Sequence, residues 1–191
     1  MSNTADSALK NLTLITGGAR SGKSLLAEQL ALAGQRPVVY LATMEELKDD
    51  AESVIRINLH RSRRPSNWHT IEAPNNLSEV ITSLENKQQT CIIDCLSLLV
   101  SNILLKADAL GEGLLPARDK VACEVESVLE AINTKPEITF LTVTNEVGSG
   151  IVPENALARS YRDLLGESNQ TFARQAATVY FTCVGLNIKL K

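Results

Sequence analysis

Residues Leu12–Ser24, "LTLITGGARSGKS", carry the clearest structural signal in this chain. Its first five residues, Leu12–Thr16, are apolar or β-branched and predict a strand. The next eight, Gly17–Ser24, fit the pattern G-x-x-x-x-G-K-[ST] and lead into a helical pattern that runs from Gly22 to Ala33. A glycine-rich turn in this place directs successive backbone N–H groups toward a polyphosphate, at the positive end of the helix dipole. The sequence therefore predicts a phosphate-binding loop.

Four side chains at or near this loop are candidates for the chemistry. Lys23 would reach the β and γ phosphates of a nucleotide, and the Ser24 hydroxyl would bind Mg²⁺. Asp94 stands near the end of the apolar run "TCIIDCL", where a second metal-site acid is expected. Glu72, at the end of "HTIE", would face the same crevice, because ligands of open α/β sheets lie beyond the carboxyl ends of the strands. A solvated acid at a strand end remains the alternative for both carboxylates.

Short β-branched runs alternate with longer helical patterns along the whole chain, which is the signature of an α/β protein. Strands are predicted at Leu12–Thr16, Val38–Thr43, His69–Pro74, Thr90–Leu96 and Glu137–Glu146. Helices are predicted at Gly22–Ala33, Glu45–Arg63, Leu77–Leu84, Leu98–Leu105, Ala117–Asn133 and from Pro153 towards Ala176. The last residues, Thr178–Lys191, predict a β-hairpin around Gly185. We expect a flexible leader over residues 1–11 and a single catalytic domain over residues 12–191.

Composition excludes several classes of protein. Of the 191 residues, 44% are hydrophobic and 21% are charged, as in an ordinary globular domain. The formal net charge of -3 argues against general nucleic-acid binding, which needs an excess of Lys and Arg. No apolar run approaches the ~20 residues that a membrane span requires. The four cysteines show no metal-binding spacing and are expected to be reduced thiols, so we expect a cytoplasmic protein.

The stretch "RINLHRSRRP", which starts at Arg56, gathers positive charge around one histidine. Arg56, His60 and Arg63 have i, i+4 and i+7 spacing, so they share one face of the predicted helix. Nearby positive charge should lower the pKa of His60 below its usual value of ~6.5 and keep the imidazole neutral and nucleophilic. Arg61, Arg63 and Arg64 could clamp phosphate oxygens. A solvated basic face with an incidental histidine is the alternative that these residues leave open.

Several motifs together resemble one known family. These are "TGGARSGKS", "YLAT", "HRSRRP", "WHTIEAP", "IIDCLSLLVSN" and "VTNEVGSGIVPENALARSYRDLLGESNQ". In this order, and spread from Leu12 to Lys189, they resemble the bifunctional adenosylcobinamide kinase / adenosylcobinamide-phosphate guanylyltransferase family. The resemblance implies an α/β fold of the P-loop NTPase (RecA-like) type. That fold is a three-layer sandwich with a mostly parallel sheet, to which this chain adds the C-terminal β-hairpin.

The resemblance also implies two activities that use Mg²⁺ with ATP or GTP. One phosphorylates adenosylcobinamide, and the other transfers GMP from GTP to adenosylcobinamide phosphate through a guanylylated histidine, here His60, giving adenosylcobinamide-GDP. Catalytic roles fall on His60 and Lys23, and metal contacts on Ser24 and Asp94. Nucleotide contacts carry over to Gly17, Gly18, Ala19, Arg20, Ser21, Gly22, Lys23, Ser24, Ala42, Thr43, Met44, Arg61, Ser62, Arg63, Arg64, Glu72 and Asp94. A homo-oligomer is implied, with a trimer as one arrangement.

Two positions depart from the family pattern. Glu167 stands where many relatives carry arginine, and Met44 stands where small or polar residues also occur. Three alternative functions stay open on the sequence. The kinase activity could be lost and only the guanylyltransferase retained; the chain could be a P-loop kinase of another small alcohol; or it could be a nucleotide-gated switch without turnover.

Overall fold

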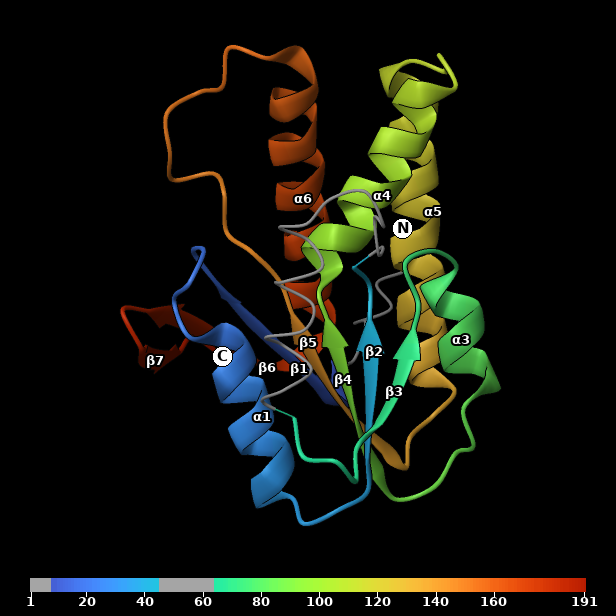
Figure 1. Cartoon of the computed structure of the whole chain (residues 1–191), viewed down its shortest axis with the longest axis vertical. Helices are drawn as coiled ribbons and strands as arrows, with labels where there is room; N and C mark the ends of the chain where they lie inside the picture. The colour runs from blue at the N-terminus through green and yellow to red at the C-terminus, as the bar shows by residue number, and fades with distance from the viewer. Residues whose placement is uncertain (1–7, 45–63) are drawn as a thin grey trace, which may run out of the picture.

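The computed structural model describes residues 8–44 and 64–191. In this part of the chain the strands form one seven-stranded sheet of order β3-β2-β4-β5-β1-β6-β7. Every neighbouring pair is parallel except β6 and β7, which form an antiparallel hairpin. The predicted mostly parallel sheet and C-terminal hairpin are thereby confirmed (Figure 1). The strands are β1 Leu9–Gly17, β2 Val38–Ala42, β3 His69–Glu72, β4 Gln89–Asp94, β5 Ile138–Val143, β6 Ala176–Cys183 and β7 Leu186–Lys189.

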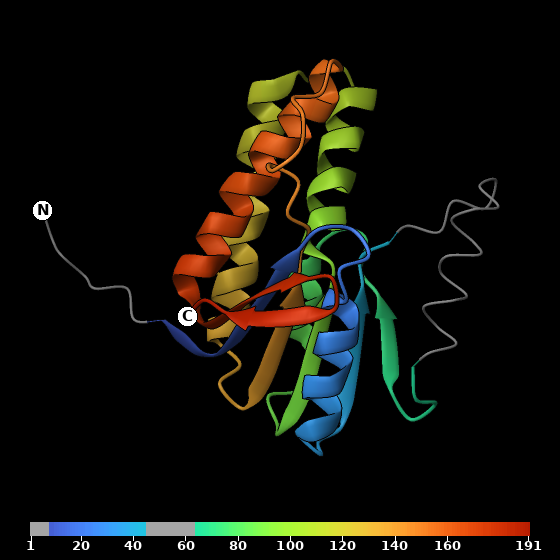
Figure 2. The ribbon, with the colours of Figure 1, turned by 90° about the vertical axis from the view of Figure 1, so that its left-hand side faces the viewer.

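The described helices cover the two faces of the sheet unequally. They are α1 Lys23–Ala33, α3 Leu77–Ser83, α4 Leu96–Ala109, α5 Leu114–Asn133 and α6 Ala156–Gln175. Side chains of α1 pack on one face, and side chains of α3, α4, α5 and α6 pack on the other, which makes three layers. Helices α4, α5 and α6 run on past the carboxyl ends of the strands (Figures 1 and 2). Among the residues that the structure describes, no helix is long and apolar enough to cross a membrane.

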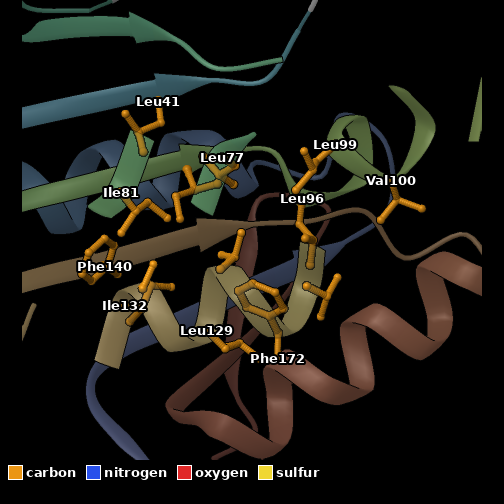
Figure 3. Close-up of a cluster of buried hydrophobic side chains, with 14 of the residues drawn as sticks. Leu41, Leu77, Ile81, Leu96, Leu99, Val100, Leu129, Ile132, Phe140 and Phe172 are labelled. Carbon is orange, nitrogen blue, oxygen red and sulfur yellow. The ribbon is translucent and has the colours of Figure 1, made fainter. Parts of the chain in front are cut away.

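Strand alternation distributes the core between the two faces. Leu41 and Ile93 point into the larger cluster with α3 to α6, whereas their neighbours Tyr40 and Ile92 point into the smaller cluster against α1. Both faces are buried, as expected for parallel strands that read as continuous apolar runs. Figure 3 shows the larger cluster, in which Phe140 of β5 and Phe172 of α6 are fully buried. Burying each large apolar side chain contributes about 1.5–3 kcal/mol.

Several element boundaries differ from the prediction. Strand β1 begins at Leu9 rather than Leu12, and the Asn11 amide donates to two carbonyls near the start of β5 at 3.0 Å each. Helix α4 begins two residues earlier than predicted and is longer. Helix α5 begins at Leu114 rather than at the predicted Ala117, so that Pro116 lies in its first turn. Proline is compatible with a first helical turn, where its missing N–H would have no intrahelical partner.

The last helix has a different start from the one predicted. Helix α6 begins at Ala156 rather than at the predicted Pro153. Asn155 is its N-cap, and the Asn155 side chain accepts a hydrogen bond from Ala158 N at 3.0 Å. An asparagine oxygen satisfies one of the free N–H groups of the first turn, which a proline cannot do. The predicted helix Glu45–Arg63 lies outside the described residues.

Candidate nucleotide site

The phosphate-binding loop lies between β1 and α1, as predicted, and its two pattern glycines have backbone conformations that favour glycine. Gly17 has φ of 153°, and a Cβ there would meet the carbonyl oxygen of Thr182 in β6 at 2.1 Å. Gly22 has φ of 105° in the left-handed region and is the N-cap of α1. The pattern at Gly17 and Gly22 therefore reflects the geometry of the loop as well as its chemistry.

Lys23 closes back over this loop. Its side chain is only 7% exposed, and its Nζ donates to the carbonyl oxygen of Gly18 at 2.6 Å. Burial lowers the pKa of Lys23 below its usual value, and the nearby Asp94 carboxylate acts in the opposite direction. Ser24 follows it in the first turn of α1. One cation is thus held at the loop together with the first-turn hydroxyl that the pattern requires.

The register of the sheet brings the two candidate acids to the same edge. Asp94 of β4 lies beside Ala42 of β2, and Ala42 lies beside Glu72 of β3. Two strand spacings separate the acids, so their backbones are roughly 10 Å apart. Strand β5 lies between β4 and the phosphate-loop strand β1. The predicted convergence of Asp94, Glu72 and the loop at the carboxyl ends of the strands is present.

Asp94 is the end of a chain of contacts on the α1 face of the sheet. The hydroxyl of Tyr40 in β2 donates to Asp94 Oδ2. The Arg64 guanidinium carbon lies 3.4 Å from the centroid of the Tyr40 ring, and Trp68 stacks on Tyr40 with ring centroids 6.5 Å apart. Burial, and then the negative charge of Asp94, raise the pKa of Tyr40 above its usual value. Arg64 is therefore linked to Asp94 through the side chain of Tyr40.

The loop after β2 is tied to the end of β4 by hydrogen bonds. Thr43 N donates to Asp94 O at 3.2 Å, and Thr43 Oγ1 both donates to Cys95 O and accepts from Cys95 N at 2.7 Å. The Asn102 amide in α4 donates to Thr43 O at 2.9 Å and to Pro74 O at 2.8 Å. The register of β2 and β4 and this network place Ala42 and Thr43 beside Asp94, and Met44 follows them in the chain. Asn102 was missed, although an amide inside the apolar run "LLVSNILL" was a readable signal.

A second network, also missed, supports the end of β5. Thr144 Oγ1 donates to Asn169 Oδ1 in α6 at 2.7 Å, and Asn169 Nδ2 donates to Asn145 O at 2.9 Å. The Asn145 amide donates to Ser97 Oγ at 3.1 Å, and Glu146 N donates to Gly17 O at 2.9 Å. The segment after β5 is therefore attached both to the phosphate-binding loop and to the helices behind the sheet.

The donor set at this edge fits a magnesium–nucleotide complex better than a metal held by protein alone. Residues 8–44 and 64–191 contain no group of three or more His, Cys, Asp or Glu side chains that could hold a metal ion. They do provide the Asp94 carboxylate at the strand end and the Ser24 hydroxyl beside the phosphate-binding loop. Mg²⁺ is usually bound through one or two carboxylates together with substrate phosphates and water.

Most of the predicted group of one histidine and several arginines is not covered by the described residues. The residues outside the described part of the chain are His60, Arg61, Ser62 and Arg63, and Arg64 is the described member of the arginine group.

Glu167, which departs from the family pattern, lies in α6. It pairs with Arg118 of α5 at 2.8 Å, and both side chains are about half exposed. An exposed pair contributes about 0–1 kcal/mol, so in this structure Glu167 forms a surface contact between helices.

Comparison with known proteins gives a full-length match. The model of a protein family described as cobinamide kinase / cobinamide phosphate guanyltransferase matches residues 13–190. The bifunctional adenosylcobalamin biosynthesis protein CobU of Escherichia coli (strain K12) is 37% identical over 184 residues, covering 94% of this chain and 99% of that protein. The protein of the same name from Salmonella typhimurium is 39% identical over 188 residues, with the same shares covered. CobP of Pseudomonas aeruginosa is 39% identical over 178 residues, covering 93% and 96%.

Solved structures share the fold at low sequence identity. A Pyrococcus horikoshii OT3 protein, PH0250, has a TM-score of 0.54 and 10% identity, covering 97% of this chain and 88% of that chain. A prototypical ATPase from the type III secretion system of pathogenic bacteria has a TM-score of 0.50 and 11% identity, covering 93% and 56%. At these identities the likeness shows the fold alone. The predicted three-layer α/β fold with a mostly parallel sheet is confirmed, and its assignment to the P-loop NTPases of RecA-like type stays a prediction.

Proposed function

Because this chain belongs to the cobinamide kinase / cobinamide phosphate guanyltransferase family, we propose that it catalyses both reactions of that family name. It phosphorylates adenosylcobinamide with ATP or GTP, and it then transfers GMP from GTP to adenosylcobinamide phosphate. The products of the second reaction are adenosylcobinamide-GDP and pyrophosphate. The observation that carries this proposal is the match over residues 13–190, which includes both the phosphate-binding loop and His60.

The kinase reaction uses the nucleotide site at the carboxyl ends of the strands. The alcohol oxygen of adenosylcobinamide attacks the γ-phosphorus, and the nucleoside diphosphate leaves. Lys23 exchanges its hydrogen bond to Gly18 O for the nucleotide phosphates, while Ser24 and Asp94 would hold Mg²⁺ together with the nucleotide. A bound Mg²⁺ would neutralise charge that develops on the phosphoryl oxygens. Positioning and charge do most of the catalysis in such a transfer. The relatives named bifunctional favour retention of the kinase activity over its loss.

The guanylyl transfer needs a protein nucleophile, and His60 is the candidate. Its neutral imidazole attacks the α-phosphorus of GTP and pyrophosphate leaves, which forms a phosphorus–nitrogen bond. A phosphate oxygen of adenosylcobinamide phosphate then attacks the same phosphorus and releases His60. Arg61, Arg63 and Arg64 hold the phosphate oxygens during both steps. The position of Arg64 against Tyr40, next to Asp94, supports a location of this group beside the nucleotide site.

Labelled GTP tests the histidine directly. Incubation with Mg²⁺ and GTP labelled at the α-phosphate, without corrinoid, should leave label on the protein, whereas label at the γ-phosphate should not be retained. The bond should be labile in acid and persist in alkali, because protonation of the ring nitrogen makes it a better leaving group. His60→Asn should abolish the label and leave phosphorylation of adenosylcobinamide largely intact. His69→Asn, at the exposed start of β3, is the matched control and should change neither step.

Two outcomes would contradict the assignment. Label that survives in His60→Asn would place the nucleophile elsewhere, and loss of both activities in a folded His60→Asn would make the residue structural. A wild-type chain that forms adenosylcobinamide-GDP only when adenosylcobinamide phosphate is supplied would be a guanylyltransferase without kinase activity.

We also propose that the chain forms a homo-oligomer, with a trimer as one arrangement. Light scattering coupled to size-exclusion chromatography measures the molar mass of the assembly.

A further inference from the structure

Tyr40 is a polar side chain in the middle of the buried strand β2. Its side chain is 1% exposed and belongs to the apolar cluster between the sheet and α1. Tyr40 lies beside Ile92 in the register, two positions before the pair formed by Ala42 and Asp94. The long aromatic side chain spans this distance along the strand, so that its hydroxyl meets Asp94 Oδ2 at the edge of the sheet. The hydroxyl of the buried Tyr40 therefore contacts Asp94, the residue proposed to bind Mg²⁺.

The ring itself is held by two further contacts. The Arg64 guanidinium carbon lies 3.4 Å from the ring centroid, and the Trp68 ring lies at an interplanar angle of 28° to it. A cation over an aromatic face and a stacked ring both restrict the orientation of the phenol. A ring so restricted presents its hydroxyl to Asp94 from one direction. The contact is a hydrogen bond from an uncharged donor to a carboxylate, which is stronger than one between neutral groups.

We propose that Tyr40 is a positioning residue for Asp94, whose carboxylate it holds in one orientation through Oδ2 so that Oδ1 is the oxygen presented to the nucleotide's Mg²⁺. This inference rests on the proposed role of Asp94 in the nucleotide site. A carboxylate fixed before the metal complex arrives loses little rotamer freedom on binding. A carboxylate without this partner has to be ordered at that moment, which weakens the metal contact.

The test is the Mg²⁺ dependence of nucleotide binding to the full chain, measured by equilibrium titration with a fluorescent GTP analogue. Tyr40→Phe keeps the ring, its contacts with Arg64 and Trp68, and its volume, and removes only the hydroxyl. The Mg²⁺ concentration at half-maximal metal-dependent binding should rise about tenfold, the lower end of what such outer partners contribute. Nucleotide affinity in the absence of Mg²⁺ should stay as in the wild type. A merely structural role would weaken nucleotide binding both with and without Mg²⁺.

Two variants complete the design. Tyr161→Phe is the matched control, because the Tyr161 hydroxyl also donates within the fold, to Ser97 O at 3.3 Å, and its loss should leave the Mg²⁺ midpoint unchanged. Asp94→Asn should raise the midpoint at least as far as Tyr40→Phe. In the double variant the shift should equal that of Asp94→Asn alone, because Tyr40 acts only through Asp94.

The outcomes separate this inference from the proposed function. A wild-type midpoint in Tyr40→Phe, with a shift in Asp94→Asn, overturns the role of Tyr40 and leaves the site intact. Additive shifts in the double variant also overturn it. No shift in Asp94→Asn removes Asp94 from the metal site and the proposed function loses that contact. Should Tyr40→Phe fail to fold, 3-fluorotyrosine in a Tyr161→Phe/Tyr180→Phe chain reports on position 40 alone. Its fluorine resonance should shift when Mg²⁺ is added to the nucleotide complex. In a chain that also carries Asp94→Asn, the addition of Mg²⁺ should not shift this resonance.

Discussion

At the scale of single residues, the most direct prediction concerns the charge at the phosphate-binding loop. Lys23→Ala removes the cation whose Nζ now lies 2.6 Å from Gly18 O. We expect kinase turnover to fall by roughly two orders of magnitude, as when one preorganised donor to the reacting group is lost. Steady-state phosphorylation of adenosylcobinamide measures this. Lys120→Ala, which removes an exposed partner of Glu112, is the control, and near-normal turnover in Lys23→Ala would contradict the assignment.

A second prediction at this scale compares two glycines. Gly17→Ala would place a Cβ 2.1 Å from the backbone oxygen of Thr182 and force a side chain into φ of 153°, so the free energy of unfolding should fall by about 2–4 kcal/mol. Gly166 lies inside α6 with no atom near its Cβ position, so Gly166→Ala should raise the free energy of unfolding by about 0.5–1 kcal/mol. Urea titration measures both. Equal changes in the free energy of unfolding for the two substitutions would contradict the roles given to the backbone conformation and the Cβ contact at Gly17.

At the scale of elements, α6 connects the surface of the molecule to the site. Its N-cap Asn155 accepts a hydrogen bond from Ala158 N, and further along the helix Asn169 contacts Thr144 and Asn145. Asn155→Ala should lower the free energy of unfolding by about 1 kcal/mol, because one first-turn N–H loses its partner. Asn155→Asp should restore most of that loss in the same denaturant titration. If the aspartate variant is as unstable as the alanine variant, the cap is not the source of the effect.

The C-terminal hairpin is the second element that acts on the site. Strand β6 pairs with β1 up to Gly17, and Gly185 N in the hairpin turn donates to Ser21 O at 2.9 Å. The last strands of the chain therefore support the phosphate-binding loop from the side opposite β5. Glu146 N, which donates to Gly17 O at 2.9 Å, supports the loop from the β5 side.

At the scale of the whole molecule, burial divides the cysteines into two pairs. Cys91 and Cys95 are buried, and burial raises the pKa of both, that of Cys95 to about 12. Cys123 and Cys183 are exposed. A thiol reacts as its thiolate, so the native protein at pH 8 should show two fast thiols with a disulfide reagent, and the unfolded protein should show four. Cys123→Ser with Cys183→Ser should remove the fast phase, and fast modification of Cys91 or Cys95 in the native protein would contradict this burial.

The sequence alone determined the features that depend on neighbouring residues. The phosphate-binding loop from Gly17 to Ser24, Asp94 at the end of an apolar strand and the hairpin around Gly185 were all readable. Each depends on local periodicity, on glycine conformations or on turn chemistry within a short window. The same local signals misplaced the starts of α5 and α6, because a proline fits inside a first turn and an asparagine is the better N-cap. The role of His60 stays a prediction.

The contacts between residues that are far apart in the sequence became apparent from the folded chain. It placed β5 between β1 and β4, attached Asn169 to the segment after β5, and directed the Tyr40 hydroxyl to Asp94, 54 residues away in sequence. Tyr40 looks in the sequence like any apolar strand residue, and Arg64 looks like one of several arginines. Their contact depends on the order and register of parallel strands, which are set by packing of both faces of the sheet at once. No local pattern encodes that choice, since pairing energies of remote segments are comparable until the helices cover the sheet.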